Sequence, residues 1–334
     1  MLDLRARKLR VFVAWALGVG ALVAAPAVAA ETHFGANDGR HAGRKSCRGV
    51  RVPTGANLQV AINRARKGAK LCLGRGTYFT RSGITLRSKQ KLVGVTRSRT
   101  VIKTSGASTV IDARNTTGVK IKRLSVTGAG GGRRCAPGCG RGISPGRKTK
   151  IVRVRVHHNQ VLGIGGSRGG LVIKKSEVDH NGHRDLYGCC TGAIKTGTAY
   201  TIKDTYVHDN VGVGIWCDVG CKGGKWRVLN NVTVRNTLGG IRYETAGAHG
   251  SALIRGNAVR RNNRLGSGGH GGIEINSSRN AVVEKNRVRR NTGPGIIIGG
   301  KRRPGLGNIM VRYNVLTHDH IQKCGGPVSC KGNR

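Results

Sequence analysis

A nine-residue pattern of apolar and polar positions recurs along this chain. Each copy begins with Ile or Val, has further apolar residues two positions apart or in short β-branched runs, and usually ends in Asn. Residues 151–159 read IVRVRVHHN, and residues 283–291 read VEKNRVRRN. The copies start 22 to 30 residues apart, a period typical of solenoids in which each repeat forms one coil. They start at residues 121, 151, 173, 202, 228, 254, 283 and 311, the first and last being the weakest.

Short segments that open with Gly follow most copies, and their apolar and polar residues alternate as in β-strands. No convincing helical stripe follows residue 67, so each coil should contain two or three short strands and no helix. The pattern therefore predicts a parallel β-helix. An Asn at the same bend of successive coils can stack and bond backbone groups of its neighbours. The 55 Gly residues suit bends that need a positive φ. The Gly-led segments are 192–196, 214–218, 240–244, 272–276 and 295–299.

The segment 57–79 reads NLQVAINRARKGAKLCLGRGTYF. With the repeats, it makes residues 47–320 resemble the right-handed parallel β-helix superfamily, which has the pectin-lyase-like fold. The resemblance implies an all-β solenoid with a short N-terminal capping helix, whose apolar face carries Leu58, Ile62 and Ala65. The GTY strand would then begin the first coil. Because the superfamily contains lyases, hydrolases, epimerases and non-catalytic adhesins, the resemblance implies a fold and leaves the chemistry open.

The ends of the chain predict its organisation. Residues 1–30 have a basic start, an apolar stretch and the small-residue site Ala-Val-Ala, which together indicate a cleaved secretory signal peptide. An uncleaved membrane anchor is the alternative. We expect a flexible lead-in over 31–46, one β-helix domain over 47–320 and a disulfide-looped C-terminal tail over 321–334. The protein is thus predicted to be secreted or extracytoplasmic, and monomeric.

The ten Cys residues fit an exported protein, because disulfides persist in oxidising compartments. Zinc is the alternative for the two pairs with closely spaced Cys, but local disulfides suit their spacing better. Cys189 and Cys190 are adjacent and either bridge each other or pair elsewhere. The remaining expected pairs are Cys47 with Cys72, Cys135 with Cys139, Cys217 with Cys221, and Cys324 with Cys330.

The net charge of +46 narrows the classes of candidate partner. Removal of the signal peptide leaves about +43. Lys174, Lys203, Arg255 and Arg312 occupy the same phrase position, which places them in one outer column at roughly 4.8 Å per coil. Such a ladder suggests a polyanionic partner or an acidic habitat, and a merely solvated basic surface is the alternative. Aromatic residues make up 4%, too few for base stacking, so an anionic polysaccharide is favoured over nucleic acid.

The coil register also brings candidate chemistry together. When the Gly-led segments are aligned on their first inward Ile, the next residue and the one two further along point outward. The chain has only 14 acidic residues, and three of them fall at these positions. We therefore expect one patch over four adjacent coils, made of Lys195, Trp216, Asp218, Arg242, Glu244, Glu274 and Asn276.

Neighbouring residues could complete this patch. Trp216 would offer an exposed indole on which a sugar ring can stack, and Asn276 would bind substrate beside it. Loop residues that could lean over the same face are His249, His270, His180, His183 and Asp185, with His270 assigned to substrate binding. Simple salt bridging between the acidic and basic residues of the patch is the alternative to a functional cleft.

Two reactions fit the patch. Elimination in a uronate polymer needs a base and a positive charge or Ca²⁺ beside the carboxylate, for which Lys195 and Arg242 with Asp218 and Glu244 are candidates. Hydrolysis needs two carboxylates, either Glu244 with Glu274 or Asp218 with Glu244. The chain lacks the Asp-Pro-His motif of alginate-epimerase relatives and the Asp-Asp motif typical of polygalacturonases.

The sequence thus predicts a secreted polysaccharide lyase or hydrolase, with all five charged patch residues in catalytic roles. Ca²⁺ is a candidate cofactor, and no metal-ligand set is predicted. A non-catalytic β-helix that binds polyanions at a cell surface is the second hypothesis. The third hypothesis is a purely structural β-helix within a larger export assembly, and the fold is the one feature that supports it.

Overall fold

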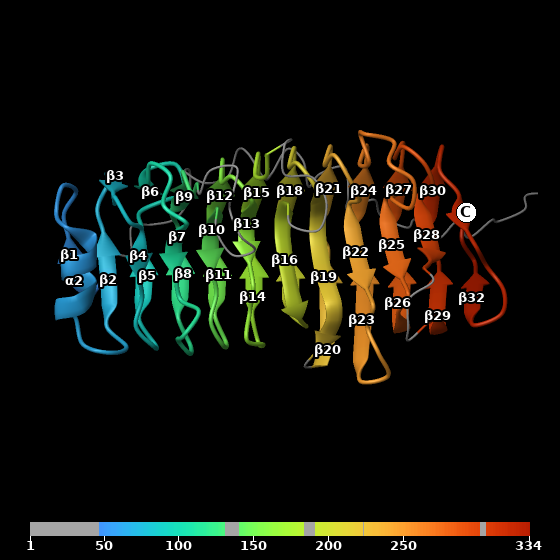
Figure 1. Ribbon diagram of the computed structural model, residues 1–334, viewed down its shortest axis with the longest axis horizontal. Coiled ribbons are helices and arrows are strands. Elements are labelled where there is room, and N and C mark those ends of the chain that lie inside the picture. The colour runs from blue at the N-terminus through green and yellow to red at the C-terminus, as the bar shows by residue number, and fades with distance from the viewer. Residues whose placement is uncertain (1–46, 131–139, 184–190, 223, 301–304) are drawn as a thin grey trace, which may run out of the picture.

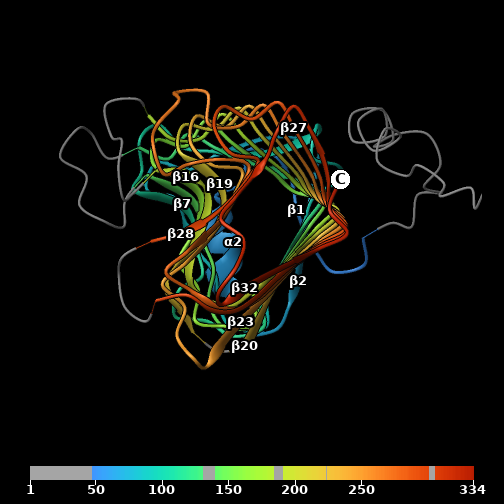
Figure 2. The ribbon, with the colours of Figure 1, turned by 90° about the vertical axis from the view of Figure 1, so that its right-hand side faces the viewer.

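The computed structural model describes residues 47–130, 140–183, 191–222, 224–300 and 305–334. Their strands form three sheets that run the length of the molecule, with the coils stacked from blue to red in Figure 1. Viewed end on, the sheets enclose a single interior (Figure 2). Successive strands of each sheet pair in parallel, one coil apart. The all-β parallel solenoid predicted from the repeats is therefore confirmed.

Each coil contributes one strand to each sheet in turn. Sheet A consists of β1 (Val50–Val52), β2 (Lys70–Leu73), β5 (Lys91–Val93), β8 (Lys120–Lys122), β11 (Lys150–Val152), β14 (Val172–Lys174), β17 (Thr201–Lys203), β20 (Gly224–Leu229), β23 (Gly250–Arg255), β26 (Arg279–Glu284), β29 (Gly307–Arg312) and β32 (Val328–Lys331). Sheet B consists of β3 (Gly76–Phe79), β6 (Thr100–Lys103), β9 (Ser125–Thr127), β12 (Arg155–His157), β15 (Glu177–Asp179), β18 (Tyr206–His208), β21 (Val232–Val234), β24 (Ala258–Arg260), β27 (Arg287–Arg289) and β30 (Val315–Thr317). Sheet C consists of β4 (Ile84–Thr85), β7 (Thr109–Asp112), β10 (Arg141–Ser144), β13 (Leu162–Gly165), β16 (Gly192–Thr198), β19 (Val213–Lys222), β22 (Ile241–Glu244), β25 (Ile273–Asn276), β28 (Ile296–Gly299) and β31 (Ile321–Gln322).

The nine-residue phrase fixes the register of the coils. All eight phrase starts pair directly with one another in sheet A, and every one of their side chains is buried in the core. Each phrase forms two strands, one in sheet A and one in sheet B, separated by a bend. The Gly-led segment that follows forms the strand in sheet C. A phrase therefore covers the part of one coil that contributes to sheets A and B.

The bends inside and after the phrase use mainly residues other than Gly. Lys175, Asp204 and Asn230 have φ values of 51°, 51° and 53° at the bend between sheets A and B. His180 and Arg235 do the same between sheets B and C, with φ values of 51° and 55°. Gly supplies positive-φ positions elsewhere in the coils, as at Gly182 and Gly212 with φ values of 89° and 108°, so the expectation from the Gly content holds outside these bends. Buried Asn side chains bond the backbone next to these bends, which offsets the cost of the left-handed conformation.

Two ladders of buried Asn side chains join the coils. In each ladder, the backbone N–H and the Nδ2 of one Asn both donate to the Oδ1 of the next; for Asn181 and Asn210 the two distances are 3.0 Å. This confirms the stacking expected of the phrase-ending Asn. The ladder between sheets B and C contains Asn159, Asn181, Asn210, Asn236, Asn262 and Asn291. The ladder between sheets A and B contains Asn231, Asn257, Asn286, Asn314 and Asn333.

The N-terminal end carries the helix α2 (Leu58–Arg64), which lies at the left end of the stack in Figure 1 and inside the outline of the three sheets in Figure 2. The side chain of Asn57 begins the helix by accepting a hydrogen bond from the Val60 N–H. Leu58, Ile62 and Ala65 are buried, as the amphipathic pattern predicted. At the other end, the segment 321–334 adds β31 and β32 to sheets C and A.

Three of the expected disulfides are present. They join Cys47 to Cys72, Cys217 to Cys221, and Cys324 to Cys330. The pairings of Cys135 with Cys139 and of Cys189 with Cys190 lie outside the described residues, as do the predicted signal peptide and lead-in. In the described ranges, no helix has the length and apolar character needed to cross a membrane.

Candidate functional site

The outer face of sheet C carries the predicted patch. Ile194, Ile215, Ile241, Ile273 and Ile296 pair in sequence along the sheet and are fully buried, so the alignment used to predict the patch is confirmed. The residue after each Ile forms an outward column, in the order Lys195, Trp216, Arg242, Glu274 and Ile297.

Trp216 lies between the two cations of this column. The Nζ of Lys195 is 3.8 Å from the centre of the indole ring, and the Cζ of Arg242 is 5.3 Å from it. Both contacts fall within cation–π range. Lys195 also pairs with Asp218, whose Oδ2 is 3.3 Å from Nζ. The start of the patch is therefore a pair of ordered cations held over one aromatic ring.

Arg242 is the centre of the patch. Its Nη2 lies 3.1 Å from Oε1 of Glu244, and its Nη1 lies 3.3 Å from Oε2 of Glu274. The indole N–H of Trp216 donates to Oε2 of Glu244 over 3.0 Å. One guanidinium thus joins carboxylates from two successive coils.

His270 approaches the same guanidinium from the loop between β24 and β25. Its Nδ1 is 3.1 Å from Oε1 of Glu274, and Nη1 of Arg242 is 3.3 Å from that nitrogen and 3.5 Å from Nε2. The Gly271 N–H also donates to Oε1 of Glu274, over 3.2 Å. The loop therefore places an imidazole beside the cation, with a carboxylate behind it.

Burial divides the patch into two groups. Trp216 is 5% exposed, Glu244 6% and Glu274 1%, whereas the side chains of Lys195 and Asp218 are 15% and 28% exposed. The prediction of an exposed indole for sugar stacking is wrong, because Trp216 packs with Val213 and Leu238 beneath the flanking cations. Lys195, Asp218, Arg242 and His270 form the accessible side, and the two glutamates lie under it.

Some predicted site residues lie outside this network. Asn276 pairs in register with Glu244, and its Oδ1 accepts from the Ser277 hydroxyl over 3.2 Å. His249 is exposed, and no contact with the patch is found for it among the described residues. His180 lies instead at the bend between sheets B and C, where its ring stacks on that of His158. His183 is exposed and follows the same bend in the chain. Asp185 lies outside the described residues.

A basic pocket opens on the same sheet, towards the N-terminus. It has a volume of about 380 Å³ and is lined by Arg114, Arg141 and Arg168 together with Asn115. Arg114 pairs with Asp112 at 2.7 Å, and Arg168 donates to Asn115 over 3.3 Å. The strand of Arg141 pairs with β13, and β13 pairs with the strand of Lys195. Positive charge therefore continues along sheet C beyond the patch.

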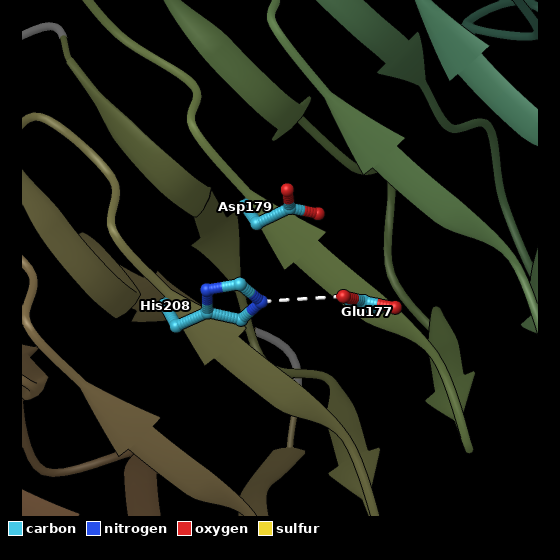
Figure 3. Close-up of side chains that lie close together, drawn as sticks. All are labelled: Glu177, Asp179 and His208. Atoms are coloured by element: carbon cyan, nitrogen blue, oxygen red, sulfur yellow. Dashed lines mark hydrogen bonds and ion pairs between the residues drawn. The ribbon is translucent and has the colours of Figure 1, made fainter. Parts of the chain in front are cut away.

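A second polar cluster covers part of sheet B, and the sequence reasoning missed it. Glu177, Asp179 and His208 lie close together on adjacent strands, and His208 faces Glu177 (Figure 3). The Nε2 of His208 is 3.3 Å from Glu177, and its Nδ1 is 2.7 Å from Asp209. The signal was present in the phrase endings HHN, DHN and HDN, where the copies that end at Asn262 and Asn291 have Arg-Arg-Asn.

His208 and its acidic neighbours Glu177 and Asp209 stabilise one another's charged forms. Burial alone would lower the pKa of His208, but its hydrogen bonds to Glu177 and Asp209 outweigh burial and raise it. Burial likewise works against ionisation of Asp209, yet hydrogen bonds from Arg235 and His208 lower its pKa to about 2. Burial and the charge of Arg155 lower the pKa of the neighbouring His157 to about 4.

The ligand atoms of Glu177, Asp179 and His208 lie within 4.8 Å of one another, a spacing that a metal ion could use. Asp179, however, already pairs with Arg155 at 2.7 Å, and both nitrogens of His208 face carboxylates. A metal would have to displace the guanidinium and take the place of a proton on His208. The donor set therefore fits an ion-pair network better than a metal site. On sheet C, Ca²⁺ would likewise have to displace Lys195 or Arg242 from its carboxylate partner.

The network on sheet B predicts a pH-dependent stability. Because its pKa is raised by folding, His208 stabilises fully below about pH 6.5 and loses this effect as the pH rises through the folded-state pKa. Asp209 stabilises above about pH 4 and loses its effect as the pH falls towards 2. His208→Gln is therefore expected to lower the free energy of unfolding by about 2 kcal/mol between pH 4 and 6.5, and by less above that range.

Unfolding midpoints from pH 4 to pH 9 measure this difference, with His249→Gln as the control at an exposed position. A cost that is constant with pH would show that the charge of His208 contributes nothing.

The comparisons with known proteins agree with this architecture. Residues 191–326 match the family model for the right-handed beta helix region. The polygalacturonase from Erwinia carotovora ssp. carotovora is similar in structure with a TM-score of 0.62, at 12% identity, over 89% of this chain and 95% of that one. The A-module of the Azotobacter vinelandii mannuronan C-5 epimerase AlgE4 gives 0.59, at 14% identity, over 83% and 89%. The pectate lyase Pel9A gives 0.57, at 15% identity, over 83% and 73%.

Among curated proteins, none matches the sequence. At these identities the structural likeness shows the fold and carries no activity with it. The chain is a right-handed parallel β-helix, as its repeats and its opening segment predicted, and it shares this fold with the three solved structures.

Proposed function

We propose that the protein is an exported enzyme that cleaves an anionic polysaccharide by elimination at a uronate residue. In this reaction a base removes the C5 proton, the C4–O bond breaks, and a C4=C5 double bond forms while the leaving oxygen takes up a proton. The observation that carries the proposal is the pair of cations, Lys195 and Arg242, held over Trp216 beside the imidazole of His270.

Positive charge is what this reaction needs first. The C5 proton of a uronate becomes removable when the charge of the adjacent carboxylate is neutralised by nearby cations. Arg242 and Lys195 supply that charge within one column of sheet C. The pocket lined by Arg114, Arg141 and Arg168 offers further positive charge to neighbouring uronates of the same polymer.

His270 is the proposed base. A carboxylate facing Nδ1 holds an imidazole in the tautomer whose Nε2 accepts a proton, and Glu274 occupies that position at 3.1 Å. Arg242 lies next to the same ring, so the proton acceptor and the carboxylate-binding cation are adjacent. Glu244 and Glu274 then act by positioning Arg242 and His270. Asp218 positions Lys195 in the same way.

The burial of the glutamates favours elimination over hydrolysis. A hydrolase needs two carboxyl groups that reach the scissile bond, one of them as an acid. Glu274 is 1% exposed and Glu244 6%, and both contact Arg242. Of the three predicted carboxylates, Asp218 alone is substantially accessible, and it pairs with Lys195. The names of the three similar structures, an epimerase, a pectate lyase and a polygalacturonase, support polysaccharide as the substrate class.

His270→Gln is expected to lower the rate of polymer cleavage about a hundredfold or more, because general-base catalysis contributes at least that much. The assay follows the ultraviolet absorbance of the unsaturated uronate, with polygalacturonate and alginate as substrates and dextran as a neutral blank. His249→Gln is the matched control, an exposed His in the loop between β22 and β23, and should keep full activity.

The assay separates the alternatives. Reducing ends without ultraviolet absorbance would mean hydrolysis, and deuterium uptake from heavy water without shortening of the chain would mean epimerisation. Activity that survives His270→Gln, Asp218→Asn and Glu244→Gln would exclude the patch as the site.

A non-catalytic polyanion-binding protein is the second proposal, and the basic pocket on sheet C favours it. It predicts binding of uronate polymers that weakens with salt and is unaffected by His270→Gln. Under either proposal, export depends on the signal peptide over 1–30, which mass spectrometry of the secreted protein would test. The β-helix domain over 47–320 and a monomeric state remain parts of the proposal.

A further inference from the structure

The N-terminal half of sheet A carries a column of lysines with no equivalent elsewhere in the described chain. Lys70, Lys91, Lys120 and Lys150 pair directly in four successive coils. Because strands of a sheet lie about 4.8 Å apart, their side chains form a regular row of ammonium groups along the solenoid. We call these four residues the lysine row.

Further cations flank the lysine row. Lys122 lies in the next outward column, in which Lys174 and Lys203 pair directly further along. The positive-φ bend beside that column adds Arg123 and Arg153. The strands β2, β5, β8, β11 and β14 contain neither Asp nor Glu. This half of the sheet is therefore a face of one sign of charge.

Acidic residues neutralise the basic residues elsewhere. In the C-terminal half of sheet A, Glu284 lies between Arg255 and Arg312 and pairs with both. The predicted column of Lys174, Lys203, Arg255 and Arg312 is thus continuous only over its two lysines. Among the described residues, no acidic partner is found for any member of the lysine row.

Repulsion among the cations of this face affects the pKa of Lys122. Burial lowers the pKa of its ammonium group, and the charges of Lys120 and Arg123 lower it further. Lys150 and Arg153 act in the same direction. A row of like charges that repel one another favours any ligand that places negative charge between them.

We propose that the lysine row binds an extended uronate polysaccharide along the solenoid axis, on a face distinct from the patch on sheet C. The strands beneath it are three or four residues long, so the face is narrow and fits a single extended chain. They contain no aromatic residue on which a nucleic-acid base could stack. A uronate polymer carries one carboxylate per sugar, a repeat comparable to the coil spacing. The choice of a uronate polymer rests on the proposed function, whereas the binding face rests on the lysine row alone.

The test compares two variants of the full exported protein with the same loss of charge. One replaces the lysine row by Lys70→Gln, Lys91→Gln, Lys120→Gln and Lys150→Gln. The control replaces four exposed lysines scattered over the surface, namely Lys67, Lys225, Lys285 and Lys323, each by Gln. Binding of polygalacturonate, dextran and oligothymidylate is measured at low and at physiological salt.

The affinity of the lysine-row variant for polygalacturonate is expected to fall about tenfold or more, with a weaker salt dependence. The control variant should stay within about twofold of the wild type. Equal losses in both variants, or none in the lysine-row variant, would overturn the proposal. Tighter binding of oligothymidylate than of polygalacturonate, lost with the lysine row, would show that nucleic acid is the ligand and would also overturn it.

The outcome is independent of catalysis. Loss of binding in the lysine-row variant together with full activity of His270→Gln would reject the proposed enzyme and keep the binding face. Unchanged binding together with an inactive His270→Gln would do the reverse.

Discussion

Asn236→Ala is expected to lower the free energy of unfolding by about 4 kcal/mol or more, the largest effect of any single truncation proposed for this protein. The Oδ1 of Asn236 accepts from the N–H and Nδ2 of Asn210 at 3.2 and 2.9 Å. Its Nδ2 donates to Asn262 and to the Val207 carbonyl. All three Asn residues are almost fully buried. Truncation leaves several buried polar groups unpaired, each at a cost of about 1–3 kcal/mol.

Denaturant unfolding followed by circular dichroism measures this loss. Asn63→Ala is the matched control, since Asn63 is exposed on the helix and, within the described ranges, its side chain accepts a hydrogen bond from Gln59 alone. We expect that control to change stability by no more than about 0.5 kcal/mol. Similar losses for both variants would mean that the ladder adds nothing beyond an ordinary side-chain contact.

Arg242→Met is expected to destabilise the protein by about 3–5 kcal/mol, because it leaves the buried Glu244 and Glu274 without their shared counterion. Replacing both glutamates by Gln in the Arg242→Met background should recover much of the loss. The reason is that the cost comes from uncompensated buried charge rather than from lost packing. Stability is again read from the denaturation midpoint.

Arg114→Met provides the comparison at an exposed position. Arg114 also binds a carboxylate on sheet C, that of Asp112, but the pair is solvated and should contribute about 1 kcal/mol or less. If Arg242→Met cost no more than Arg114→Met, or if the glutamine replacements failed to restore stability, the buried ion pairs would not be holding the patch together.

The sequence predicts the architecture well because the phrase encodes it locally. An apolar start, a bend and a terminal Asn repeat in every coil, so the register of Ile151 against Ile173 follows from alignment alone. The same register brings Lys195, Arg242 and Glu274 into one column, as the structure shows. Periodicity is sufficient here because neighbours in the solenoid are neighbours in the repeat.

Burial of the patch could not be predicted in this way. Strand alternation tells only that Trp216 points outward, and the residues that cover it come from elsewhere, such as Leu238. The loops between coils have no sequence repeat. The sequence therefore could not predict that His270 reaches the patch whereas His249 does not. The cluster on sheet B was missed for another reason. His208 and Asp179 share a phrase position, but alternation of apolar residues carries no information about which polar groups will pair.

The arrangement of one residue per coil in each outer column has a consequence for evolution and engineering. Duplication of a whole coil, from one phrase start to the next, would extend the Asn ladders and the core without disturbing their geometry. The same event would lengthen a charged column by one residue while leaving the patch on sheet C intact. The number of coils and the chemistry of the site can therefore change separately, and the length of polymer held by the protein would be set by a count of modules.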